Sequence, residues 1–183
     1  MTCLEPADSV MLIYGENSIV YISIGSNMGD SVANCLSSIS FIENIPSCRV
    51  TMVSDLYETE PIGVKDQAWF INCAVEIRTE LKPLEFLNAC LEIEAVMGRI
   101  RQDRWGPRII DIDLLLFGQE IIHINENLII PHPGMHERRF VLEPLFQIAP
   151  MAKHPVFGCT VSDLLKKLPA NQQKIKPLKR NFL

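Results

Sequence analysis

The order of strand-like and helix-like patterns along the 183-residue chain most restricts how it can fold. Apolar patterns typical of strands occupy 19–24, 49–58, 69–78 and 109–117, whereas 29–45 and 83–98 carry apolar residues at helical spacing. Two helices on one face of a mainly antiparallel sheet bury such a βαββαβ order most economically. We therefore predict an α+β, ferredoxin-like domain with helices packed on the sheet, although another strand order would give the same periodicities.

The rest of the chain adds to this core without dividing it. A hairpin-like stretch follows residue 117, and shorter helices are expected near 140–148 and 161–168. Because the length suits one domain, we expect a single domain over 19–183, with residues 1–18 as an N-terminal extension. No apolar run approaches the roughly 20 residues of a membrane span.

Composition and charge exclude several classes of protein. With 48% apolar and 21% charged residues, the chain is neither disordered nor fibrous. Seventeen Lys and Arg against 22 Asp and Glu give a net charge of −5, which disfavours nucleic acid and anionic membranes as partners. Six cysteines without CxxC spacing, and an N-terminus unlike an export signal, indicate reduced thiols and a cytoplasmic protein.

The sharpest chemical signal is a pair of acids, Asp111 and Asp113, in the last strand of the predicted core. Residues two apart on a strand face the same way, so these carboxylates should project from one face about 6–7 Å apart. Carboxylates suit Mg²⁺, which usually binds a nucleotide's phosphates at the same time. A solvated sheet edge is the plainer explanation of a bare D-x-D pair.

Arginines directly before the acids strengthen the metal interpretation. Arg99, Arg101, Arg104 and Arg108 fall within ten residues, and the guanidinium fork matches phosphate oxygens. Together with the acids they predict a polyphosphate–Mg²⁺ site, over which the segment from Arg101 to Arg104 could swing as a cover. A solvated basic loop, or ion pairs with the two acids, would also explain them.

A second group of residues could bind a flat heterocycle. Phe70 and Asn72 share one face of their strand, and Phe140 lies downstream, so a ring could stack between phenyl groups and hydrogen-bond to the amide. Core packing explains any single Phe equally well. His132, between two prolines, could donate to a phosphate. Gly25-Ser26-Asn27, after the first strand, could offer backbone amides to a ligand or form a plain turn.

In combination these motifs resemble the 6-hydroxymethyl-7,8-dihydropterin pyrophosphokinase family of folate biosynthesis. The most specific is the string RWGPRIIDID, residues 104–113. The resemblance covers about residues 20–168. It is also carried by Gly25-Ser26-Asn27, residues 56–63, Phe70-Ile71-Asn72, Glu94 with Gly98-Arg99, and residues 130–145.

The resemblance implies an enzyme that transfers pyrophosphate from ATP to the hydroxymethyl group of the dihydropterin, giving AMP and the pterin diphosphate. It implies that Asp111 and Asp113 hold two Mg²⁺ ions, with ATP as co-substrate. Arg99, Arg101, Trp105 and Arg108 would join them in catalysis, Arg101 and Trp105 from a mobile loop. The ATP-binding residues would be Glu94, Arg99, Arg108, His132 and Arg138. The pterin-binding residues would be Thr59, Ile62, Phe70, Asn72 and Phe140.

Two other functions compete on the residues alone. A ferredoxin-like domain could bind RNA through the arginine-rich segment and Trp105, but the net charge and the two acids oppose this. A D-x-D sugar-nucleotide transferase usually needs a longer chain. We therefore expect a monomer whose partners are ATP and a dihydropterin, with no nucleic acid and no membrane.

Overall fold

The computed structural model describes residues 17–63, 66–99, 106–124 and 128–178. Its elements follow the predicted βαββαβ order, with later additions. The core elements are β1 (Ser18–Ser26), α1 (Ser31–Glu43), β2 (Cys48–Val53), β4 (Phe70–Thr79), α2 (Pro83–Val96) and β5 (Asp111–Phe117). The others are β3 (Tyr57–Thr59), β6 (Ile122–Ile124), β7 (Leu128–Ile130), η1 (Met135–Glu137), α3 (Arg139–Ile148), α4 (Val161–Lys167) and β8 (Ile175–Pro177).

The core strands have the spatial order of a ferredoxin-like sheet. The main sheet runs β5-β1-β4-β3-β8, and β2 pairs with β4 on the side that β3 also occupies. Every strand pair among the described residues is antiparallel. The predicted α+β class and topology are therefore confirmed.

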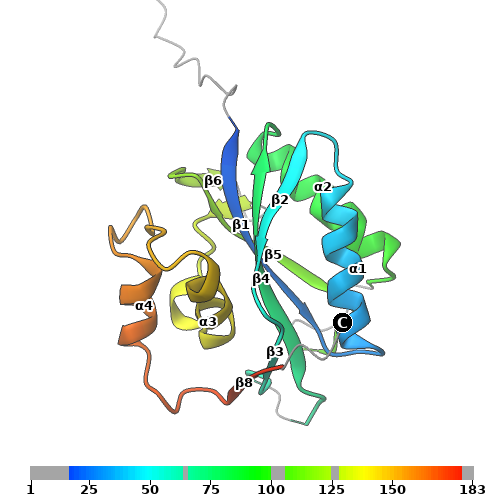
Figure 1. Ribbon diagram of the computed structural model, residues 1–183, viewed down its shortest axis with the longest axis vertical. Coiled ribbons are helices and arrows are strands. Elements are labelled where there is room, and N and C mark those ends of the chain that lie inside the picture. Colours follow the sequence, from blue (N-terminus) through cyan, green and yellow to red (C-terminus); the bar gives the residue numbers. More distant parts are fainter. Residues whose placement is uncertain (1–16, 64–65, 100–105, 125–127, 179–183) are drawn as a thin grey trace, which may run out of the picture.

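Helices cover both faces of this sheet (Figure 1). On one face, α1 and α2 bury a cluster that includes Val75 and Ile77 of β4. On the other, α3 and α4 bury a second cluster that includes Ala74 of β4. Because successive strand residues point to opposite faces, β4 contributes to both clusters, and the C-terminal additions form a third layer.

The boundaries of α1 and α2 follow from local capping. Asp30 accepts a hydrogen bond from Ala33 N at 3.0 Å, as an N-cap acid should. Pro83 occupies the first turn of α2, and the Glu85 side chain accepts from Lys82 N at 2.9 Å. Gly98 follows α2 at φ +88°, in the left-handed region that glycine favours. These residues thus define where α2 begins and ends.

The single strand predicted for 49–58 is wrong, because the segment forms β2 and β3 with a break between them. At the break, Ser54 N donates to Ala74 O and Ser54 Oγ accepts from Ala74 N, both at 2.9 Å. A side chain thus replaces one backbone partner of β4, and the pairing register also shifts between Val50 and Met52. Strand β8 was not predicted. No described helix is long and apolar enough to cross a membrane.

Candidate active site

A row of paired residues crosses the sheet at the site. Asp111 of β5 pairs with Gly25 of β1, and Gly25 pairs with Asn72 of β4. Paired residues point their side chains to the same face, so the acid and the amide share a face with no side chain between them. A Cβ on Gly25 would stand 2.6 Å from Asn72 Oδ1. Glycine therefore keeps the floor between them open.

A cavity of about 530 Å³ lies over this floor. Asn72 is 2% exposed, and its Nδ2 donates to the buried Thr59 Oγ1 at 2.7 Å. This bond fixes the amide so that Oδ1 faces the space above Gly25. The cavity is lined by all five residues that the resemblance assigns to the pterin: Thr59, Ile62, Phe70, Asn72 and Phe140.

A second cavity of about 630 Å³ lies between α2, β5 and β7. Its walls combine leucines, among them Leu84 and Leu87, with the charged Glu94 and Arg99. Three residues line both cavities: Asp111, Asp113 and His132. Of the residues expected to bind ATP, Arg108 and Arg138 line the first cavity rather than the second. The two hollows therefore meet at the acidic face of β5.

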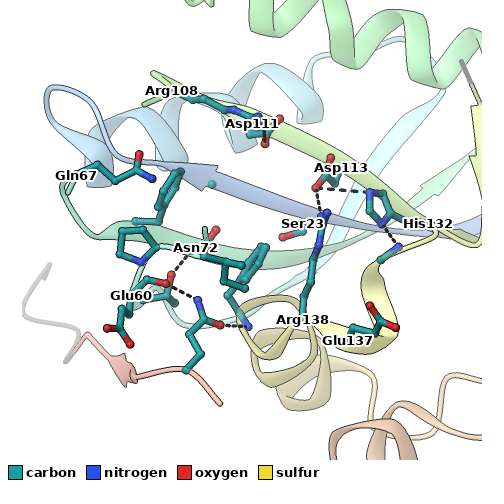
Figure 2. A pocket seen from close by; sticks show the side chains of 18 of the residues that line it. Ser23, Glu60, Gln67, Asn72, Arg108, Asp111, Asp113, His132, Glu137 and Arg138 are labelled. Carbon is teal, nitrogen blue, oxygen red and sulfur yellow. Dashed lines mark hydrogen bonds and ion pairs between the residues drawn. The ribbon is translucent and has the colours of Figure 1, made fainter. Parts of the chain in front are cut away.

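Each acid of β5 is paired with cations. Asp111 Oδ1 forms an ion pair with Arg99 Nη1 at 2.7 Å, and Oδ2 pairs with Arg108. Asp113 Oδ2 lies 3.5 Å from Arg138 Nη1 and 3.9 Å from His132 Nε2 (Figure 2). Burial raises the pKa of Asp113, and the nearby Asp111 raises it further, while these cations oppose the shift. Positively charged arginines thus offset the repulsion between the two acids. A bound metal ion would offset the same repulsion.

Glu94 of α2 is a buried acid that contacts both Arg99 and the backbone of β5. It is 3% exposed, pairs with Arg99, and its Oε1 accepts from Ile112 N at 2.7 Å. Burial raises its pKa, whereas the bond from Ile112 N and the charge of Arg99 oppose the shift. Glu94 therefore satisfies an amide of strand β5 and holds Arg99 against Asp111.

Hydrogen bonds of its backbone and of its ring fix the orientation of His132. Its backbone follows the cis bond Ile130–Pro131, and its N donates to Leu115 O at 2.9 Å. Its Nδ1 accepts from Gly134 N at 3.1 Å, so the neutral ring carries its proton on Nε2, toward Asp113. Burial lowers the pKa of His132; the charge of Arg138 adds to this and that of Asp113 opposes it.

The sequence did not reveal the role of Asn27. Its Oδ1 accepts from Arg108 N at 2.7 Å, and its Nδ2 donates to Gln67 Oε1 at 3.1 Å. Its backbone N donates to Arg108 O at 3.0 Å and is not offered to a ligand. Gly25 and Ser26 lie inside β1 rather than in a turn. Asn27 thus ties together the segments before β4 and β5, a role for which only its place in a strand-end motif gave a signal.

Two expected catalytic residues, Arg101 and Trp105, lie outside the described residues, as does Arg104. Gly106, at the near end of the same segment, lines the first cavity.

Comparison with known proteins was made on sequence and on structure. Residues 21–150 match the family model of 7,8-dihydro-6-hydroxymethylpterin-pyrophosphokinase. The 2-amino-4-hydroxy-6-hydroxymethyldihydropteridine pyrophosphokinase of Bacillus subtilis is 48% identical over 132 residues, 72% of this chain and 78% of the relative. That of Methylorubrum extorquens is 43% identical over 158 residues, 85% of this chain and 98% of the relative.

Longer proteins contain a similar unit. The folic acid synthesis protein fol1 of Schizosaccharomyces pombe is 42% identical over 155 residues, 85% of this chain but 21% of the relative. A crystal structure of an HPPK-DHPS in complex with substrates superposes with a TM-score of 0.67 at 17% identity, over 83% of this chain and 43% of that chain. That of wild-type Plasmodium falciparum HPPK-DHPS gives 0.65 at 18% identity, over 83% of this chain and 45% of that chain. The chain thus spans less than half of these solved proteins.

Proposed function

The chain belongs to the 7,8-dihydro-6-hydroxymethylpterin-pyrophosphokinase family, and we propose that the two cavities meeting at β5 are its two substrate sites. It is a transferase that moves the pyrophosphoryl group of ATP to hydroxymethyldihydropterin in folate synthesis. Family membership removes the RNA-binding and sugar-nucleotide alternatives. The observation that carries the proposal is the common wall formed by Asp111, Asp113 and His132.

The pterin occupies the first cavity. Its ring stacks between Phe70 and Phe140, and its polar edge meets Asn72 Oδ1. Thr59 supports this contact because it holds Asn72 Nδ2, and Ile62 closes the wall beside the ring. A planar, amide-bearing heterocycle suits two aromatic rings and one oriented carboxamide. The open floor at Gly25 leads from this ring position toward Asp111.

The nucleotide occupies the second cavity with its polyphosphate directed at β5. Arg99 and Arg108 bind phosphate oxygens, and Arg138 and His132 approach from the far side of Asp113. Glu94 acts through Arg99, whose guanidinium it holds. Guanidinium forks and an Nε2–H donor are the groups that polyphosphate oxygens accept from.

We assign two Mg²⁺ ions to Asp111 and Asp113. Their donor set fits this metal, because hard carboxylate oxygens suit Mg²⁺ and phosphates and water usually complete its shell. Among the described residues no group of three or more His, Cys, Asp or Glu could hold a metal, which suits a site that the nucleotide helps to form. When bound, the ions neutralise phosphate charge and orient both substrates.

The products define the bond changes. The hydroxymethyl oxygen forms a bond to the β-phosphorus of ATP, the bond between that phosphorus and the α-bridging oxygen breaks, and the hydroxyl proton leaves to solvent. Such a step needs alignment, charge neutralisation and exclusion of water rather than a protein nucleophile. The stacked rings fix the hydroxymethyl group, the arginines fix the phosphates, and Asn27 fixes the segment that carries Arg108.

Three further assignments belong to this proposal. Arg101 and Trp105 form a movable cover over the reacting groups, as the resemblance implies. The enzyme acts as a monomer, since both proposed substrate sites are built from one chain. It works in the cytoplasm, which the unpaired state of the five described cysteines supports.

The direct test is AMP formation from Mg-ATP with and without 6-hydroxymethyl-7,8-dihydropterin, followed by mass analysis of the pterin. We expect AMP only when the pterin is present, and a pterin that has gained two phosphoryl groups. Pterin-independent hydrolysis of ATP, or a pterin of unchanged mass, would contradict the proposal.

A further inference from the structure

The segment from Pro169 to Pro177, here called the strap, joins the outer helical layer to the sheet. It leaves α4 and ends in β8, which pairs with β3 (Figure 1). Glu60 N donates to Lys174 O at 2.9 Å, and Leu178 N donates to Leu56 O at 2.8 Å just beyond it. The strap lies outside residues 21–150, which the family model matches.

Gln173 of the strap connects two walls of the first cavity. Its side chain is buried, with 6% exposed, and the residue lines the cavity. Its Oε1 accepts from Phe140 N at 3.1 Å, and its Nε2 donates to Glu60 O at 2.5 Å. Both partners are backbone atoms, so the bridge constrains chain positions rather than flexible side chains.

The bond to Phe140 also supplies a missing helix cap. The first turn of a helix leaves backbone N–H groups without partners, and the N-cap residue of α3, Arg138, makes no side-chain capping bond. Gln173 satisfies the N–H of Phe140 from another segment. The start of α3, and with it the direction of the Phe140 ring, therefore depends on the strap.

Neighbouring contacts clamp the same junction. Gln172 Nε2 donates to Glu137 O at 2.8 Å. Arg139 Nη2 donates to the carbonyls of Leu168 and Pro169 at 3.3 and 3.2 Å. Phe140 at this junction faces the first cavity, while the opposite wall continues from Glu60 to Pro61 and Ile62.

We propose that Gln173 is a positioning residue for the pterin: its amide sets the separation between Phe140 and the Glu60–Ile62 wall, and so the affinity of the first cavity for the ring. The inference rests on the proposed place of the pterin. Stacking and edge contacts both depend on the spacing of the walls, and a gap held at two backbone points is ready before the ligand arrives. The second cavity is not lined by the strap, so the affinity for ATP should not depend on Gln173.

The test compares binding of the two substrates to Gln173→Ala and to the wild type. We expect the Kd for 6-hydroxymethylpterin, measured by titration calorimetry, to rise about tenfold, the order expected when two buried hydrogen bonds are lost. The Kd for a non-hydrolysable Mg-ATP analogue should stay within about twofold. An unchanged pterin Kd, or equal losses for both ligands, would overturn the proposal.

Gln147→Ala is the matched control. Gln147 lies on α3, the helix that also carries Phe140. It connects α3 to the segment before β3, since its Oε1 accepts from Asp55 N and its Nε2 donates to Asp55 Oδ2. It lines neither cavity. We expect unchanged binding of both ligands, so a loss of pterin affinity as large as that of Gln173→Ala would indicate general loosening of α3 and refute a specific role.

Two further variants keep the test decisive. Gln173→Glu preserves the volume and the acceptor for Phe140 N but removes the donor to Glu60 O, so it should also weaken pterin binding; wild-type affinity in this variant would refute the role. Asn72→Ala separates the inference from the proposed function. If Asn72→Ala binds pterin normally, the assigned pterin site is wrong; if only Gln173→Ala binds normally, the strap inference alone fails.

Discussion

Asp111 and Asp113 are kept on one face of β5 at a cost in stability. Adjacent carboxylates on one strand repel each other, and burial of Asp113 adds to that penalty. Three arginines and one histidine compensate this repulsion: Arg99, Arg108, Arg138 and His132. Apolar residues at the two acidic positions would serve stability alone far more simply.

We therefore predict that Asp111→Asn and Asp113→Asn each reduce kcat by about 10³-fold or more, because the negative charge that binds the proposed ions is lost while the shape of the side chain remains. Steady-state AMP release gives kcat, and circular dichroism checks the fold. Asp30→Asn is the matched control, since Asn is as good an N-cap as Asp. Full activity in either site variant would remove the two-ion assignment.

His154 gives the folded state a distinct pH dependence. Its side chain is 4% exposed and stacks on Phe157 at 4.3 Å between ring centroids, with His136 edge-on at 6.2 Å. Burial, and to a lesser extent His136, lower the pKa of His154. The unfolded chain, with a pKa of about 6.5, then binds the proton more tightly than the native protein. The neutral His154 ring therefore contributes fully to the stability of the fold above the unfolded-state pKa, and this contribution is lost as the pH falls through the native pKa.

We expect the denaturant midpoint of the wild type to fall between about pH 7 and pH 5, around the ordinary His pKa. In His154→Gln the midpoint should decrease less with falling pH, by up to the effect of binding one proton, because no buried imidazole remains to be protonated. Urea unfolding at a series of pH values measures it. His123→Gln, on exposed β6, should keep the wild-type slope; the same slope in His154→Gln would contradict the assignment.

Asn27 shows how a strand end can couple two segments that line the first cavity. Its side chain joins the segment before β4 to the segment before β5, and β1, which ends just before Asn27, lies between these two strands in the sheet. Its hydrogen-bond partners among the described residues include neither acid, so we expect it to affect turnover through the placement of Arg108.

Asn27→Ala should accordingly lower kcat by about tenfold while changing the KM for ATP much less, as expected when alignment rather than ground-state binding is lost. Steady-state kinetics with each substrate varied provides the measurement. Asn44→Ala, which removes a local hydrogen bond from the side chain to Ser40 O, is the control. An Asn27→Ala variant that raises KM with unchanged kcat would show that the residue serves binding instead.

The elements that the sequence predicted correctly are those with long, regular patterns. Strand β4 alternates over ten residues, and α2 has Pro83 and Gly98 at its two ends, so both were placed nearly at their observed bounds. The break between β2 and β3 depends on Ser54 replacing a backbone partner of Ala74, a tertiary contact that no local pattern encodes. Strand β8 is three residues long and forms only because β3 offers an open edge.

For the candidate site too, the sequence predicted features within one strand but not those that depend on contacts between distant segments. Asp111, Asp113, Phe70 and Asn72 follow from strand alternation and chemistry, because each pair lies on one strand. Their approach across the sheet depends on register, which sets Gly25 between Asp111 and Asn72. Gln173 was missed because a lone glutamine in a polar C-terminal segment carries no chemical signal until the fold brings it to Phe140.

Taken over the whole molecule, the sheet is the shared boundary of two hydrophobic clusters. Ile42 of α1 packs in one and Leu142 of α3 in the other, and neither is exposed. The acids of β5 and the amide of β4 occupy the strand ends between these layers. Because both clusters use side chains of β4, neither helical layer can be lost without exposing a face of the strand that carries Asn72.

Leu142→Ala and Ile42→Ala should therefore each destabilise one common unfolding transition, by about 3 kcal/mol for removing a large buried aliphatic side chain. We expect guanidinium unfolding followed by circular dichroism and by tryptophan fluorescence to give coincident curves, with a lower midpoint and an unchanged slope. Leu36→Ala, on the exposed side of α1 at 48% exposure, should shift the midpoint far less. A two-step curve for Leu142→Ala would mean that α3 and α4 unfold as a separate unit, and the strap could then hold Phe140 only loosely against the sheet.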